Sequence, residues 1–131
     1  MRALDANVLI RFVTNDDANQ AAAVERLFAE CHRNREHLFI STPVMCELVW
    51  VLKNGLRQEK TEIVKVLDRL IEDDLFQIEH QPLVLQALDR YRRGKAGFAD
   101  YLIGQIGSHA GCRDTVTFDK TLKGSRGFTI L

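Results

Sequence analysis

The chain has 131 residues, 46% of them hydrophobic and 27% charged, a size and composition that predict one domain over residues 1–131. Its 18 lysines and arginines balance 18 aspartates and glutamates, so bulk positive charge does not hold it to nucleic acid. No apolar stretch approaches the roughly 20 residues of a membrane span, and the N-terminus does not resemble a signal peptide. We therefore expect a cytoplasmic protein without a membrane segment.

The first half of the chain alternates short apolar runs with helical periods. Strands are predicted at residues 2–4 and 38–40, with a short and a longer helix between them. Thr42 and Pro43 predict the start of a third helix, with a hydroxyl cap followed by proline at the first helical position, and Gly55 predicts its end. The apolar residues that predict the first two helices are Val8, Leu9, Phe12 and Val13, then Val24, Leu27, Phe28 and Cys31.

The second half continues this alternation and indicates an α/β fold with a small, mainly parallel, five-stranded sheet. The predicted order is a helix, a strand at 76–80, two helices, and strands at 115–118 and 128–131. The last helix contains Gly104 and Gly107, which cost roughly 1 kcal/mol each against alanine, so we expect another backbone to pack closely there. The residues that predict the helices are Ile63, Val66, Leu67, Leu70 and Ile71, then 82–93 with Gly94, then Leu102, Ile103, Ile106 and Ala110 with Gly111.

Four carboxylates interrupt apolar runs: Asp5, Glu47, Asp100 and Asp119. A buried acid is costly unless it is paired or bound to a cation, and these segments contain no basic partner. Asp5 and Asp119 follow predicted strands, and the carboxyl ends of parallel strands are where such folds bind ligands. Clustered carboxylates repel each other unless a cation is present, and an all-oxygen set suits Mg²⁺ or Mn²⁺. The pattern therefore predicts a metal site that hydrolyses phosphodiesters.

Each acid also has a purely structural explanation. Asp5 suits a helix cap, Glu47 a solvent-facing helix position, Asp100 the favourable start of a helix, and Asp119 the start of a turn. Trp50 suits core or dimer packing better than base stacking, because apolar residues surround it.

The four acidic motifs, in this order, resemble those of PIN-domain ribonucleases, and the likeness to single-domain VapC-like toxins covers essentially the whole chain. The motifs are Leu4-Asp5-Ala6-Asn7-Val8-Leu9, Cys46-Glu47-Leu48, Phe98-Ala99-Asp100 and Thr117-Phe118-Asp119. The resemblance implies a three-layer α/β/α domain and a metal-dependent endoribonuclease that is the toxin of a toxin–antitoxin pair.

The resemblance also implies roles for particular residues. Asp5, Glu47, Asp100 and Asp119 are the expected catalytic and metal-binding acids. Asn7 is expected to support the first acid and Thr117 to orient a carboxylate. Ala6 departs from the family pattern, which usually has threonine there. Members usually form homodimers and are blocked by an antitoxin that covers the acidic cleft.

Basic residues near these motifs are candidate contacts for RNA phosphates, although each also suits a solvated surface. The candidate RNA contacts are Arg11, Arg92, Arg93, Lys95 and Lys120.

Two other functions stay open: an RNA-processing nuclease of the same family, and a phospho-acceptor signalling domain. The second would need an acid after the third strand, where the chain has His80-Gln81-Pro82 instead.

Overall fold

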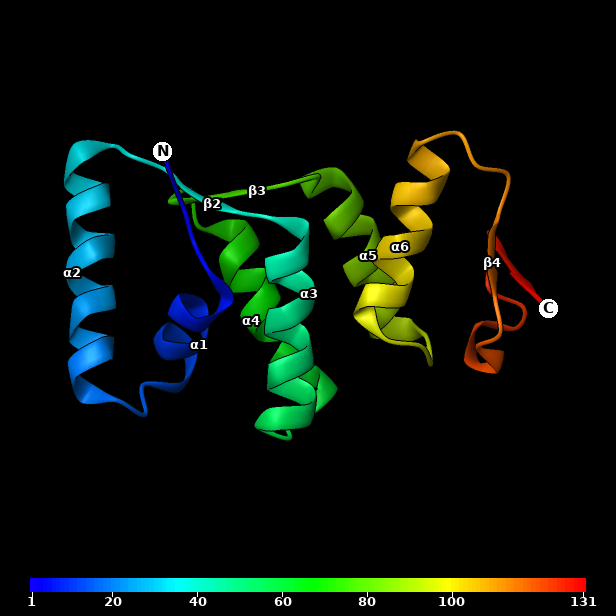
Figure 1. The fold of residues 1–131 in the computed structure, drawn as a ribbon, viewed down its shortest axis with the longest axis horizontal. Helices are drawn as coiled ribbons and strands as arrows, with labels where there is room; N and C mark the ends of the chain where they lie inside the picture. The colour runs from blue at the N-terminus through cyan, green and yellow to red at the C-terminus, as the bar shows by residue number, and fades with distance from the viewer. The chain divides into compact units, whose positions relative to one another are not determined.

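The computed structural model describes residues 1–131, which divide into two units, Met1–Gln81 and Pro82–Leu131 (Figure 1). Each unit contains its own ladder of parallel strands and its own helices. No helix in either unit combines the length and the apolar character needed to cross a membrane.

The first unit is built on a three-stranded parallel sheet of order β1-β2-β3. Arg2 of β1 aligns with Leu38 of β2, and Leu38 aligns with Phe76 of β3. The elements are β1 Arg2–Ala3, α1 Ala6–Thr14, α2 Ala18–Asn34, β2 Leu38–Ile40, α3 Thr42–Trp50, the π-helix η1 Val51–Gly55, α4 Lys60–Glu72 and β3 Phe76–Ile78.

Helix boundaries in this unit follow from residues that supply or lack capping groups. Asp17 caps α2, because its Oδ1 accepts from the Gln20 N–H at 3.0 Å. Helix α1 ends where Asn15 takes a left-handed conformation with φ of 51°, a conformation that asparagine tolerates better than most residues. The prediction of Thr42 as a cap is wrong: Ser41 is the N-cap of α3 and makes no side-chain capping bond.

The core of the first unit lies where α1 packs against α2 and α3 and where α4 packs against β3. Burying each large apolar side chain contributes roughly 1.5–3 kcal/mol, so this core orders the elements that carry Asp5 and Glu47. Phe28 joins α2 to the sheet through an edge contact with the Phe76 ring, with 5.5 Å between centroids. Fully buried members of this core include Leu9, Leu38, Ile40, Met45, Leu48, Leu52, Ile63, Leu67 and Leu70.

Helix α3 continues into the π-helix η1, and the helical stretch ends at Gly55 as predicted. Trp50, the last residue of α3, is 65% exposed. Trp50 therefore does not pack in the core, and its indole is a surface group beside η1. The alternative part of the prediction, packing in a dimer, stays a prediction.

The second unit contains two helices and a two-stranded parallel ladder, in which Thr115 of β4 aligns with Phe128 of β5. Tyr91 and Phe98 join its two helices through an edge contact with ring centroids 6.1 Å apart. The elements are α5 Gln81–Arg93, α6 Phe98–His109, β4 Thr115–Thr117, the 3₁₀ helix η2 Lys120–Leu122 and β5 Phe128–Ile130.

Gly104 is buried on α6 because the Phe128 ring lies directly against it. A Cβ at Gly104 would meet the Phe128 Cζ at 2.5 Å, and one at Gly107 would meet the Thr115 Oγ1 at 3.3 Å. The expectation of a close approach is confirmed at Gly104, but a side chain and not a backbone makes it. The missing Cβ thus lets β5 pack on α6.

The α/β fold class is confirmed, and all five predicted strands are present and pair in parallel. They form one ladder of three strands and one of two, each within its own unit. The third strand ends at Ile78, two residues earlier than predicted, because His80 has a left-handed φ of 53° that ends the extended run.

Candidate active site

Asp5 follows β1 and is the N-cap of α1. Its Oδ1 accepts a hydrogen bond from the Ala6 N–H at 2.8 Å, and its side chain is exposed. The predicted capping role is therefore real, but it uses one oxygen and leaves Oδ2 without a protein partner. Asn7, two residues after Asp5, is exposed. Together with Arg11 and Gln20 it lines a cavity of about 350 Å³ between α1 and α2.

Glu47 lies in the middle of α3 with its side chain exposed, while Leu48 and Val49 beside it are buried. Its carboxylate makes no hydrogen bond or ion pair, so both oxygens are free for a ligand.

Glu79 holds the start of the helix that carries Glu47, and sequence analysis missed it. Its Oε1 accepts from the Thr42 N–H at 3.1 Å, supplying the capping bond that Ser41 does not make. The nearby Thr42 hydroxyl, and then this N–H, lower the pKa of Glu79 below its ordinary value. Glu79 is also an acid directly after β3, a position at which sequence analysis had found none.

Asp100 occupies the first turn of α6, where a carboxylate interacts favourably with the helix dipole. Its Oδ2 accepts from the Gly97 N–H at 2.9 Å, which fixes the side chain against the loop that enters the helix. Tyr101 holds the same loop, because its hydroxyl accepts from the buried Ala96 N–H at 3.3 Å. Gly94 makes room for that hydroxyl, since a Cβ there would lie 1.9 Å from it.

Asp119 follows β4 and caps the short helix η2. Its Oδ1 accepts from the Thr121 N–H at 2.9 Å and from the Thr121 hydroxyl at 2.7 Å. The side-chain bond, then the backbone bond, lower the pKa of Asp119. The Thr117 hydroxyl instead accepts from the Asp119 N–H at 3.0 Å and positions the backbone. Thr121, which orients the carboxylate, was missed by sequence analysis, although the Asp-x-Thr turn pattern could have indicated it.

None of the four acids is buried, so the burial argument that first selected them is wrong. Asp5 and Glu47 are exposed, and Asp100 and Asp119 are partly exposed. None of them forms an ion pair, and every one has at least one oxygen without a protein partner. This all-oxygen, unpaired donor set fits Mg²⁺ or Mn²⁺ in its chemistry.

The acids are divided equally between the two units, with Asp5 and Glu47 in the first and Asp100 and Asp119 in the second. No group of three or more histidines, cysteines, aspartates or glutamates within either unit is arranged to hold a metal ion. The four-acid metal site therefore stays a prediction.

The basic side chains predicted to contact RNA differ in whether they already form ion pairs within the protein. Arg11 is engaged with Asp16 and Gln20, and so ties α1 to α2. Arg93 pairs with Asp89 one turn earlier on α5. Lys95 and Lys120 are exposed and carry no ion pair, which leaves their charges available.

Comparison with known proteins decides the family. The model of the PIN domain matches residues 2–124, which is nearly the whole chain. The chain belongs to the PIN domain family. The resemblance seen in the four acidic motifs is thereby confirmed, and the PIN match extends over both units.

A relative of this PIN domain is described as a VapC ribonuclease, from Aquifex aeolicus (strain VF5). It is 28% identical over 123 residues, which cover 94% of this chain and 90% of the relative. The two proteins are thus alike over nearly their entire lengths.

Proposed function

We propose that this PIN domain is a metal-dependent endoribonuclease and the toxin of a toxin–antitoxin pair. The observation that supports it most is the set of four unpaired carboxylates, Asp5, Glu47, Asp100 and Asp119, in a chain that matches a VapC ribonuclease over 94% of its length. The four acids together bind Mg²⁺ or Mn²⁺.

The bound ion supplies an activated water and neutralises charge on the scissile phosphate. The chain's own residues set the geometry of the acids that hold it. Glu79 fixes the helix of Glu47, the Gly97 N–H fixes Asp100, and Thr121 fixes Asp119. Such supporting partners typically contribute 10- to 100-fold in metal affinity or activity.

In this proposal RNA phosphates are contacted by the basic residues predicted from the sequence, and an antitoxin covers the acids of a cytoplasmic homodimer. Lys95 and Lys120 are the best-placed of these residues, because Arg11 is already held by Asp16 and Arg93 by Asp89. The exposed Trp50 and Leu56 offer apolar surface for contact between protomers.

The first test is cleavage of total RNA by purified protein with Mg²⁺ and with EDTA. We expect products with Mg²⁺ and none with EDTA, and equal cleavage in both would contradict the metal mechanism. Expression in a host, with and without the reading frame that neighbours its gene, then separates a toxin from an RNA-processing nuclease. Toxicity that the neighbour relieves supports the toxin, whereas harmless expression of an active nuclease supports RNA processing.

A further inference from the structure

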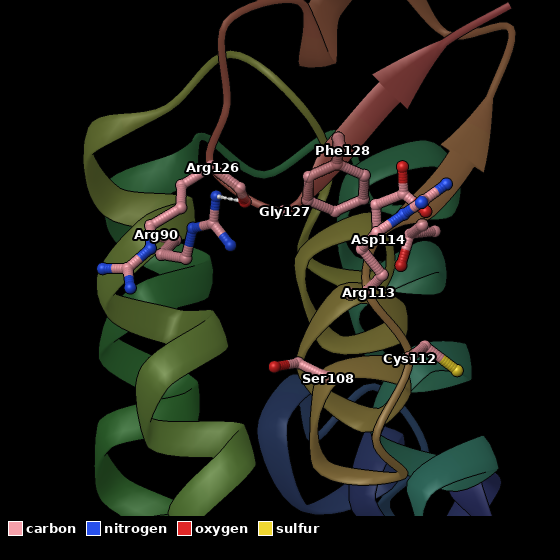
Figure 2. Close-up of a pocket in the computed structure, with 10 residues that line it drawn as sticks. Arg90, Ser108, Cys112, Arg113, Asp114, Arg126, Gly127 and Phe128 are labelled. Carbon is pink, nitrogen blue, oxygen red and sulfur yellow. Dashed lines mark hydrogen bonds between the residues drawn. The ribbon is translucent and has the colours of Figure 1, made fainter.

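A second feature of the C-terminal unit lies apart from its two acids: a cavity of about 40 Å³ lined by three arginines (Figure 2). It is formed by α5, the C-terminal half of α6 and the start of β4 and β5. The residues that line it include Arg90, Ser108, Arg113, Asp114, Arg126 and Phe128.

Arg90 is fixed in place before any ligand binds. Its Nη2 donates to the Arg126 carbonyl at 2.8 Å, the bond drawn as a dashed line in Figure 2. Its guanidinium also lies 5.2 Å from the Tyr101 ring centroid and 5.6 Å from that of Phe128. A guanidinium has five N–H donors, so most of them are still unused. Because the side chain is already ordered, it loses little entropy when it binds an anion.

The positive charge of the cavity is not balanced by its acids. The side chains of Arg113 and Arg126 make no hydrogen bond or ion pair. Asp114 is the one carboxylate in the lining, and it accepts from the Thr129 hydroxyl at 2.6 Å. The lining therefore carries three arginines and one carboxylate, which leaves an excess of positive charge.

The cavity has room for groups of the size of water, such as the oxygens of a phosphate, because about 10–15 Å³ of such space is enough for one water molecule. Arginine is also the side chain whose fork of donors best matches phosphate geometry.

We propose that this cavity binds one backbone phosphate of the RNA substrate, an inference that rests on the proposed nuclease function. Asp100 is in the first turn of α6 and Ser108 in its last, which separates them by about 12 Å along the helix axis. Asp119 likewise follows the end of β4, whereas Thr115 at the cavity begins it. The bound phosphate is therefore not the cleaved one, and it anchors the strand independently of its sequence.

The test measures affinity for a short single-stranded RNA in EDTA over a series of salt concentrations. The variant Arg113→Ala/Arg126→Ala should bind roughly tenfold more weakly at low salt, and its slope of log K against log salt should be smaller by about 0.7, the value for one phosphate on a single strand. The matched control, Arg26→Ala/Arg33→Ala, removes the same charge from the exposed side of α2. It should change affinity by less than about twofold. Equal losses in both variants, or no loss in the first, would overturn the proposal.

Cys112 provides a second readout at the cavity itself, because it is exposed and lines the cavity. RNA, and inorganic phosphate at higher concentration, should slow alkylation of Cys112 in the wild-type protein but not in Arg113→Ala/Arg126→Ala. Unchanged alkylation with both probes would exclude an anion in the cavity. Protection by phosphate together with no Mg²⁺-dependent cleavage would instead retain the site and refute the nuclease function.

Discussion

The acids of the two units are held in different ways. In the first unit, Glu47 makes no side-chain bond and Asp5 accepts one from its own helix. In the second, Asp119 accepts two bonds from Thr121 and Asp100 reaches back to Gly97. The first unit thus places its acids through the packing of whole helices, and the second through short local turns. We expect substitutions near the acids to affect function directly in the second unit and through helix position in the first.

The largest effect is expected at Asp100, the acid held at a helix start. Asp100→Asn should lower RNA cleavage with Mg²⁺ by at least roughly a hundredfold, because it removes one of the four charges proposed to bind the metal ion. Asparagine keeps an oxygen for the Gly97 N–H, so the melting temperature should change little. Initial rates and thermal unfolding measure the two effects. Asp89→Asn, which breaks only the exposed pair with Arg93, is the control. Near-normal turnover of Asp100→Asn would show that Asp100 is not one of the catalytic acids.

A stability difference is expected between two glycines of α6. Gly104→Ala should destabilise the protein by about 1–3 kcal/mol, because its Cβ would overlap the Phe128 ring. Gly107→Ala is the matched control, with a Cβ 3.3 Å from the Thr115 hydroxyl and a gain in helix propensity of up to about 1 kcal/mol. Urea unfolding measures both. If Gly104→Ala is the more stable variant, the Phe128 contact does not anchor β5.

A smaller effect on activity is expected at Thr121, which orients Asp119. Thr121→Val removes the hydroxyl donor but keeps the backbone donor, so cleavage should fall by about tenfold. The rate at several Mg²⁺ concentrations measures whether metal affinity is lost. Thr61→Val, on the exposed side of α4, should have no effect. An equal change in both variants would show that cleavage does not depend on the bond between Thr121 and Asp119.

The smallest effect is expected at Glu79, and it depends on pH. Since its pKa is lower in the folded state, its ionised form stabilises the fold above the ordinary pKa of 4.5, and this contribution disappears as the pH falls through the folded value. Glu79→Gln should therefore cost about 0.5 kcal/mol at pH 7, the low end for a helix cap, and nothing well below pH 4. Unfolding at both pH values measures this difference, with Glu30→Gln on α2 as the control. A cost that persists in acid would show that charge is not the cause.

The sequence predicted the features that depend on local pattern. The alternation of apolar runs located the five strands and six α-helices, and Gly55 marked a helix end where the structure has it. Contacts between distant residues were missed, because the signal is divided between segments. Glu79 caps a helix that begins 37 residues earlier, and Phe128 fills the space left by Gly104. The burial of the four acids was also predicted wrongly, since an apolar run does not say which side of a helix faces water.

The alignment of the strands has a consequence for the order of folding. In the first unit, parallel pairing joins Arg2 to Leu38 and Leu38 to Phe76, so a long stretch of chain closes before each pair forms. In the second, Thr115 meets Phe128 across a connection only one short helix long. Loop closure costs more entropy for longer loops, and chains with local contacts fold faster. The ladder of β4 and β5 is therefore expected to form early, and the three-stranded sheet of the first unit to form in the slow step.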